Sequence, residues 1–171
     1  MCIYCHCTIN NELGTLNLNN VNITVTGQKQ AIYITDGTVT IDGNSHITSE
    51  TTGISRDSVL HRGTITCLTN GTLVVKGGTI EGTEQNAISS EGTVIIGEED
   101  GTIDATTPII IGKVNAINSI GTLSIYDGIF KGETAAINGT IDAIEQNTRW
   151  VDTNEIIGAT TYLVKYLEVI T

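Results

Sequence analysis

The sequence predicts an all-β fold, in which a parallel β-solenoid of about five to six coils precedes a non-repetitive C-terminal strand segment. Three observations favour this fold. Gly-Thr steps recur along the chain, and Ala-Ile steps recur between them in the same order. Equivalent units lie roughly 20 to 30 residues apart, which is the spacing of stacked repeats. The apolar residues are mainly Ile, Val and Leu, and β-branched side chains suit strands.

Each repeat unit reads as three short strands separated by turns. The first strand is brief, as at Ala87-Ile88, the second alternates, as in Leu73-Val74-Val75, and the third follows a turn, as at Thr79-Ile80. Glycines such as Gly82 and Gly132 supply the backbone conformations that tight corners need. A unit this small cannot bury its own apolar face, so neighbouring units must stack into one continuous core.

Two other folds explain the pattern less well. A helix needs apolar residues at positions i, i+3, i+4 and i+7, which no segment shows over three turns, and glycines cost a helix about 1 kcal/mol each. An antiparallel sandwich or barrel also has short strands and regular turns, and it is the main alternative. Because a sandwich does not need sequence self-similarity, the repeated order of the two steps favours the solenoid.

Three runs carry a more specific resemblance: AIYITDGTVTIDG over residues 31–43, GTLVVKGGTIEG over 71–82 and AINSIGTLSIYDGIFKG over 116–132. They resemble the degenerate repeats of right-handed parallel β-helix proteins of pectate-lyase-like architecture, of the kind common in bacterial surface proteins and phage particles. The resemblance covers residues 14–141 and implies a right-handed solenoid. It implies no particular activity, because that architecture hosts lyases, adhesins, tailspikes and inert stalks alike.

The two ends of the chain differ from the repeats and divide it into three expected parts. Residues 1–13 are expected to form a cysteine-bearing arm, residues 14–141 the solenoid, and residues 142–171 a cap or an edge-strand segment. An uncovered solenoid end recruits other chains through its strand edges. The candidate assembly edge or cap consists of side chains that alternate along one strand: Tyr162, Leu163, Val164, Tyr166 and Leu167.

The composition limits the classes of function. Charged residues make up only 16% of the chain and aromatic residues 4%, and the net charge is −11. Nucleic-acid binding needs a basic surface, which a chain this acidic lacks. We therefore expect no nucleic-acid partner. No apolar run reaches about 18 residues, and the N-terminus lacks the basic and apolar regions of a signal peptide. We therefore expect no membrane span and no signal peptide in this chain.

The cysteines are the densest reactive group in the sequence. Cys2, Cys5 and Cys7 lie together in the N-terminal arm, and Cys67 lies alone in a predicted strand. These four are candidates for disulfides within the chain or between subunits, because the arm can reach a neighbouring chain as easily as its own. Zinc binding together with His6, and thiols without a role, are the alternatives. The ligand spacing is too tight for a usual zinc site, so we predict no metal and no cofactor.

Acidic residues are the candidates for catalysis, because a lyase of this architecture would need clustered carboxylates for Ca²⁺ and a basic side chain to act on a proton. The chain offers Asp36, Asp42, Glu98, Glu99, Asp100, Asp104 and Asp127. Asp36, Asp42 and Asp127 fall next to glycine in the repeat, and the run at 98–100 is typical of a solvated turn, so turn chemistry explains them. We predict no catalytic residue and no enzyme.

These observations together predict a structural protein. We expect a self-assembling subunit of an extracellular fibre, appendage, phage particle or cell surface, with solenoids stacked head to tail. Its partner would be another copy of itself. A carbohydrate-binding adhesin module, with glycans as partners, is the first alternative. A polysaccharide lyase or hydrolase is the second.

Overall fold

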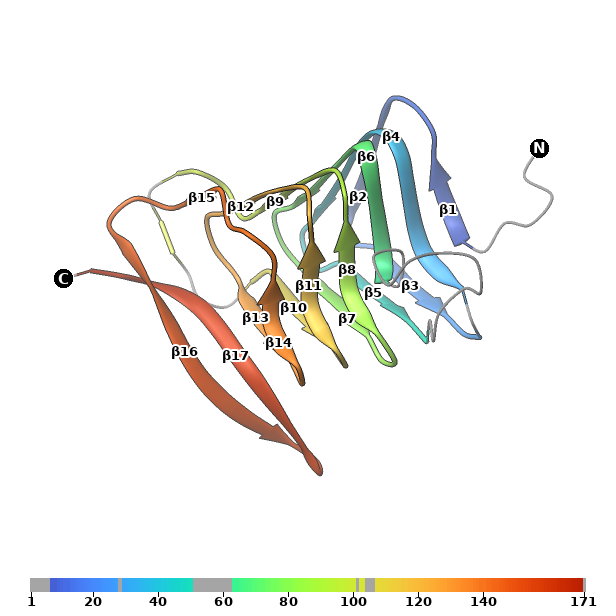
Figure 1. Cartoon of the computed structure of the whole chain (residues 1–171). Helices are drawn as coiled ribbons and strands as arrows, with labels where there is room; N and C mark the ends of the chain where they lie inside the picture. Colours follow the sequence, from blue (N-terminus) through green and yellow to red (C-terminus); the bar gives the residue numbers. More distant parts are fainter. Residues whose placement is uncertain (1–6, 28, 51–62, 101, 104–106, 171) are drawn as a thin grey trace.

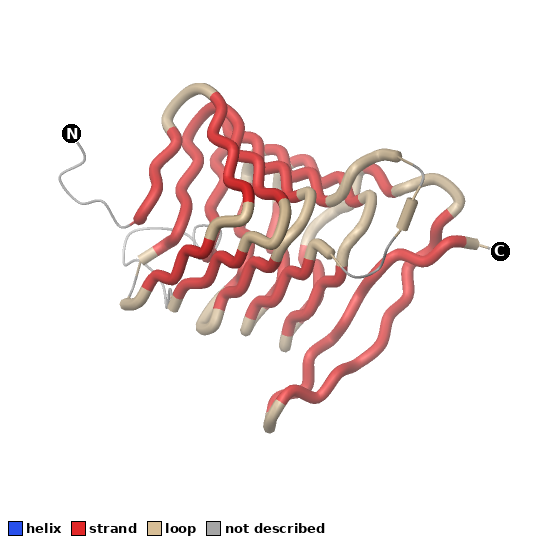
Figure 2. Tube along the Cα trace, turned by 180° about the vertical axis from the view of Figure 1, so that it is seen from behind, coloured by secondary structure: helices blue, strands red, loops and turns tan. Residues whose placement is uncertain are grey.

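The computed structural model describes residues 7–27, 29–50, 63–100, 102–103 and 107–170. Within these ranges the protein is all-β, because strands are joined by turns and no helix is present (Figure 2). None of the described segments therefore forms a helix with the length and apolar character needed to cross a membrane. The predicted all-β class is confirmed.

The strands follow one another in sets at successive levels, which we call rungs (Figure 1). Rung 1 contains β1 (Cys7–Asn11), β2 (Thr15–Asn19) and β3 (Asn22–Val25). Rung 2 contains β4 (Gln30–Asp42) and β5 (His46–Ser49), and rung 3 contains β6 (Gly63–Val75) and β7 (Thr79–Gly82). Rung 4 contains β8 (Asn86–Ser90), β9 (Thr93–Ile96) and β10 (Ile109–Gly112).

The last rungs carry the chain to its C-terminal end. Rung 5 contains β11 (Asn115–Ser119), β12 (Thr122–Ile125) and β13 (Ile129–Gly132). Rung 6 contains β14 (Ala135–Asn138) and the two-residue β15 (Ala143–Ile144). Strands β16 (Thr148–Ile157) and β17 (Thr160–Val169) then form an antiparallel pair, which we call the C-terminal hairpin.

Sheet A contains ten strands, and all of them pair in parallel. It has two columns. The first column consists of β1, the first halves of β4 and β6, then β8, β11 and β14. The second consists of β2, the second halves of β4 and β6, then β9, β12 and β15. Each rung thus contributes one strand, or half of a long strand, to each column.

Sheet B forms a third column of seven strands and is mixed. Strands β3, β5, β7, β10 and β13 pair in parallel. Strand β17 then pairs antiparallel with β13, and β16 pairs antiparallel with β17. Because the direction reverses twice, β16 runs in the same direction as β13. Figure 1 shows the hairpin beside β13 at the end of the molecule opposite β1.

Apolar side chains form rows that pass from rung to rung and build the core. In the first column the row contains Ile32, Ile65, Ile88 and Ile117, which are successive partners in register and have no exposed surface. The second column has an equivalent buried row of Val39, Leu73, Val94 and Leu123. Full burial of one such side chain contributes about 1.5–3 kcal/mol. Contacts between rungs therefore contribute to the core at every level.

The Gly-Thr steps that begin at residues 14, 37, 71, 92 and 121 mark the corner between the first and second columns. A Cβ placed on Gly121 would lie 2.0 Å from the carbonyl oxygen of Gly92, and one on Gly92 would lie 2.5 Å from that of Gly71. Ordinary contacts of a Cβ are 3.4–4 Å. Glycine is required here because the backbone of the neighbouring rung occupies the space of a side chain.

The parallel pairing of sheet A begins before residue 14. Strand β1 lies within the segment expected to be an arm, yet it pairs with β4 and places Ile9 opposite Ile32. Ile9 packs against the buried core, and this contact explains why the segment joins the sheet. At the other end, β15 pairs with β12 beyond residue 141.

Candidate functional site

Within the described residues, sheet A has a strand with an unpaired outer edge at each of its two ends. At one end β1 and β2 each pair with β4 alone, and at the other end β14 pairs with β11 alone. The apolar row of the first column also ends there, in the partly buried Ile9 and Ile137. An unpaired edge offers backbone N–H and C=O groups to another chain. These two edges are the candidate functional site.

Sheet B ends differently, because the C-terminal hairpin places a pair of charged side chains at its last two strands. The apolar row of sheet B runs through Ile47, Ile80 and Ile110 to Phe130. The next residue in register is Lys165, and Asp152 lies opposite Lys165 in turn. Their side chains form an ion pair, with 2.7 Å between Nζ and Oδ1. Charged side chains at such positions discourage the pairing of further strands.

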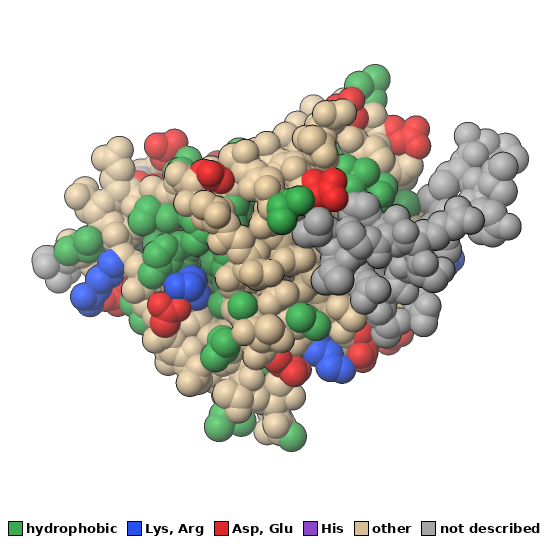
Figure 3. All heavy atoms as spheres, in the orientation of Figure 1, with side chains coloured by type: hydrophobic (Ala, Val, Ile, Leu, Met, Phe, Trp, Pro, Cys, Tyr) green, Lys and Arg blue, Asp and Glu red, His purple; other side chains and the backbone are tan. Residues whose placement is uncertain are grey.

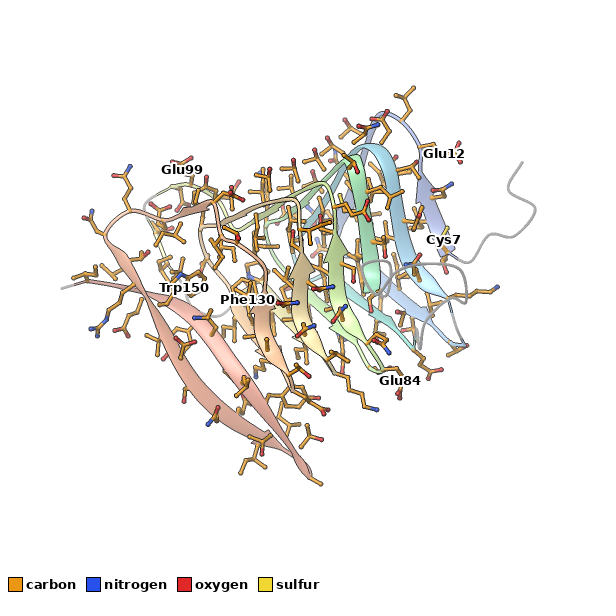
Figure 4. The ribbon with its side chains drawn as sticks, in the orientation of Figure 1. Cys7, Glu12, Glu84, Glu99, Phe130 and Trp150 are labelled. Carbon is orange, nitrogen blue, oxygen red and sulfur yellow. The ribbon has the colours of Figure 1, made fainter. Side chains whose placement is uncertain are left out.

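An aromatic contact anchors the hairpin to the core. The rings of Phe130 and Trp150 meet edge to face, with 6.3 Å between their centres, and Figure 4 shows both between β13 and the hairpin. The Nζ atom of Lys165 lies 5.1 Å from the centre of the Trp150 ring, a cation–π distance. Leu167, opposite Trp150 in register, is 1% exposed. Packing therefore fixes the inner part of the hairpin.

The five residues expected at an assembly edge or cap all lie in β17, inside sheet B between β13 and β16. Leu163, Tyr166 and Val164 face β13 in the antiparallel register together with Lys165. Val164 and Leu167 are buried, Tyr162 and Tyr166 are half-buried, and Leu163 is exposed. The outermost strand is β16, which the alternating pattern of residues 162–167 does not predict. Its signal was Gly158, a positive-φ turn residue between two strand-like segments.

A groove of about 430 Å³ runs between β14 and the hairpin. It is lined by Ala135, Ala136 and Ile137 from β14, and by residues 152–154 and 163–165 from the hairpin. Figure 3 shows hydrophobic side chains gathered at this end of the molecule, beside a neighbouring basic and acidic pair. At the C-terminal edge of sheet A, the apolar strand β14 therefore lies along one side of this groove, and the C-terminal hairpin forms the other side.

Two of the four disulfide candidates, Cys2 and Cys5, lie outside the described residues. Cys7 is half-buried in β1, opposite Gln30, at the end of the molecule away from Trp150 (Figure 4). Cys67 has a free thiol with no exposed surface. Its Sγ lies 3.8 Å from the carbonyl oxygens of Leu68 and Thr93. Cys67 is therefore a core residue at the column corner.

Burial of Cys67 should make the stability of the protein sensitive to alkaline pH. Burial raises the pKa of its thiol from 9.0 to about 11. The unfolded state therefore loses this proton first, so the stability present below pH 9 falls as the pH rises towards 11. The loss attributable to this thiol is on the order of 2–3 kcal/mol. Urea unfolding at several pH values checks this.

The Cys67→Ala variant is the control for that pH series. It should be less stable than the parent at neutral pH, and the difference between the two proteins should shrink above pH 9. The other cysteines, tyrosines and lysines titrate in both proteins, so the comparison removes their contribution. A constant difference across the series would show that the thiol is not protected from ionisation.

The acidic residues beside glycine act in turns. The carboxylates of Asp36, Asp42 and Asp127 accept hydrogen bonds from the backbone N–H of the next residue, which is glycine in each case, at 2.6–2.7 Å. Asp100 accepts a hydrogen bond from the backbone N–H of Thr102, at 2.9 Å. These contacts lower the cost of tight corners. Asp104 lies outside the described residues.

Among the described residues, Lys76, Glu98, Asp100 and Asp127 line one hollow of about 150 Å³, in which Lys76 forms an ion pair with Glu98 at 2.6 Å. The described residues contain no set of three or more His, Cys, Asp or Glu side chains placed to hold one ion. Glu99 and Glu145 line another hollow of about 410 Å³, whose other lining residues are Gln146, Asn147, Thr148 and Val169. We assign no catalytic role to these two carboxylates, because the hollow has no basic group and no third carboxylate among these residues.

Comparisons with known proteins find no counterpart. No family model matches this chain, and neither a curated protein nor a solved structure is significantly similar to it.

Proposed function

We propose that this chain is a right-handed parallel β-solenoid that serves as a structural, self-assembling subunit, whose copies join head to tail through sheet A. One observation carries the proposal: the apolar row of the first column ends at an unpaired strand on both sides, with Ile9 at one end and Ile137 at the other. A second copy in the same orientation can continue both the backbone pairing and the row. Such a heterologous contact does not close on itself and builds a filament.

The order of strand pairing supports the solenoid. Strands that follow one another by one rung pair in parallel in all three columns, through rung 5. A chain that returns to a parallel neighbour in the same sheet does so with a right-handed connection in about 98% of cases. This rule, together with the pairing order, supports the right-handed form over an antiparallel sandwich.

The proposed assembly lies outside the cell or on the surface of a cell or particle. Disulfides persist in such an oxidising setting, and Cys7 lies in β1 at the proposed joint, with Cys2 and Cys5 a few residues before it. Disulfides between subunits would then reinforce the backbone contacts. The partner in this proposal is a second copy of the same chain.

Negative-stain electron microscopy of the purified protein tests the proposal. Each copy has a net charge of −11, so repulsion opposes association and salt should promote it. We expect ordered filaments at about 0.5 M salt, where charges more than about 4 Å apart are screened, and shorter ones at low salt. Particles that stay monomeric by light scattering at every salt concentration would overturn the proposal.

The cysteines should strengthen the filaments without being needed for the fold. A variant with Cys2→Ser, Cys5→Ser and Cys7→Ser should keep the circular dichroism of the parent, while its filaments dissociate at lower temperature and in milder detergent. Reductant should have the same effect on the parent protein. Filaments of equal resistance in variant and parent would remove disulfides from the proposal and leave the sheet contact in place.

A second candidate function, carbohydrate binding, is favoured by one surface. The outer face of the second column carries an in-register row of threonines: Thr15, Thr38, Thr72, Thr93 and Thr122. These hydroxyls give an uncharged, hydrogen-bonding strip. Monomeric rods that bind on a glycan array, and lose binding with Thr72→Val and Thr93→Val, would favour the adhesin over the structural subunit.

A further inference from the structure

The C-terminal edge of sheet A is shaped to receive one particular strand. In the described chain β14 has β11 as its paired neighbour on one side, and the groove beside the hairpin on the other. The groove wall is apolar near β14, through Ala136 and Ile137. An extended segment in this groove can pair with the backbone of β14 and bury an apolar side chain there.

We infer that the occupant of this groove is β1 of a second copy, paired in parallel with β14, with Ile9 opposite Ile137 and Asn10 opposite Asn138. This inference rests on the proposed function and specifies its contact. The register follows from the rows of the first column. One row contains Ile9, Ile32, Ile65, Ile88, Ile117 and Ile137, and the next contains Asn10, Tyr33, Thr66, Ser89, Asn118 and Asn138.

Hydrogen bonds between asparagines give this contact a direction. The Nδ2 of Asn138 in rung 6 donates to Oδ1 of Asn118 in rung 5, at 2.8 Å, and Asn115 donates in the same sense to Asn86, also at 2.8 Å. In both pairs the later rung donates to the earlier one. An incoming Asn10 occupies the next rung, so its Nδ2 can donate to Oδ1 of Asn138.

Asn10 is suited to change partners on binding. In the single chain its Nδ2 donates to the exposed Glu12 carboxylate at 2.7 Å, and its buried Oδ1 has no hydrogen-bond partner. The proposed contact moves the Nδ2 donor from the exposed Glu12 carboxylate to Oδ1 of Asn138 and leaves the Oδ1 acceptor of Asn10 unchanged. The second strand of the incoming copy, β2, would meet β15 in the same way.

The hairpin is compatible with this occupant. Strand β16 runs in the same direction as β13, so β3 of the incoming copy meets a strand of matching direction at the outer edge of sheet B. The residues of β16 that lie across β17 from β13 are Val151, Asp152, Thr153 and Asn154. Strands β1 and β2 of the incoming copy therefore meet parallel edges in sheet A, whereas β3 meets a strand of matching direction whose Asp152 discourages direct pairing.

Cysteine cross-linking tests the register. The starting protein carries Cys2→Ser, Cys5→Ser and Cys7→Ser, which leaves only the buried Cys67. One derivative adds Asn10→Cys and another adds Asn138→Cys. Residues opposite each other on adjacent strands lie about 4.8 Å apart, within the range that a disulfide spans. The two derivatives are mixed at the salt concentration that gives filaments and are then mildly oxidised.

We expect the mixture to give about tenfold more covalent dimer on a non-reducing gel than either derivative alone, because pairing holds the thiols at high effective concentration. The matched control mixes the Asn10→Cys derivative with one that carries Ala159→Cys at the exposed hairpin turn. Dimer at the control level would overturn the inference. Equal dimer from the Asn10→Cys derivative alone would also overturn it, since it indicates a head-to-head contact.

Microscopy of the same mixtures separates this inference from the proposed function. Filaments without the expected cross-link would overturn the register and leave self-assembly standing. If the mixtures give neither filaments nor the cross-link, although each derivative is folded by circular dichroism, both the register and the proposed function are overturned.

A charged side chain at the edge of β14 provides a second test. Ile137→Lys should abolish filaments, whereas Ile156→Lys, at a hairpin residue that is 75% exposed, should not.

Discussion

Replacing Gly121 by alanine should destabilise the protein by about 3 kcal/mol or more, one of the largest effects of any single methyl group in the chain. The added Cβ would lie 2.0 Å from the carbonyl oxygen of Gly92 and 2.5 Å from that of Glu91. These atoms are backbone, and they lie in the turn between β8 and β9, the strands that pair in parallel with β11 and β12. The clash can be relieved only by separating rungs 4 and 5, which breaks the pairing of β9 with β12.

The matched control for Gly121→Ala is Gly14→Ala, at the same kind of corner in rung 1. A Cβ on Gly14 meets no atom within 4 Å, so this variant pays only for its φ of +86°. That strain costs about 1–2 kcal/mol. Urea unfolding followed by Trp150 fluorescence measures both variants. Gly121 does not have a positive φ, so a loss no larger than that of Gly14→Ala would contradict the clash with the neighbouring rung.

Replacing Phe130 by alanine should cost about 3–5 kcal/mol. Phe130 has no exposed surface, ends the apolar row of sheet B, and holds the ring of Trp150 at 6.3 Å. The variant leaves a cavity between β13 and the hairpin, so the hairpin loses its anchor as well as the core its largest buried side chain. Chemical unfolding gives the loss, and a red shift of Trp150 emission reports its exposure.

Phe130→Leu is the control for that variant, because it keeps an apolar side chain in the same place. We expect it to cost less than about 1.5 kcal/mol and to leave the Trp150 emission near that of the parent. If the alanine variant unfolds at nearly the parent's urea concentration, the hairpin is held by its pairing with β13 alone, and the aromatic contact adds little.

The strand pattern could be predicted from the sequence because it repeats. Ala87-Ile88 and Ala116-Ile117 do lie in the first column, and the buried Leu73 and Val75 alternate with the half-buried Thr72 and Val74 in the second column. The reason for the glycines was predicted only in part. Several corners need a positive φ, such as Gly97 and Gly128, but at Gly121 the decisive factor is the neighbouring backbone, which one sequence does not reveal.

The end of sheet B could not be predicted in the same way, because it interrupts the repeat. Lys165 has the sequence context of an exposed strand residue, yet its register places it next to Phe130, and its ammonium group meets Asp152 and Trp150. These three residues are distant in sequence from Phe130. Only the antiparallel return of β17 brings them there. The unpaired edge of β14 could not be predicted either, because a strand's own sequence does not show whether another strand pairs with it.

The hairpin also has a consequence for the form of any assembly. It adds two strands beyond β13 in sheet B, whereas sheet A ends one strand beyond β11 and β12. A second copy seated on β14 is therefore held about 4.8 Å farther away on the side of sheet B, the width of one strand. This wedge tilts each copy in the same sense relative to the last. Repeated along a polymer, the tilt produces a curved or coiled fibre, with the excess strands on its outer side.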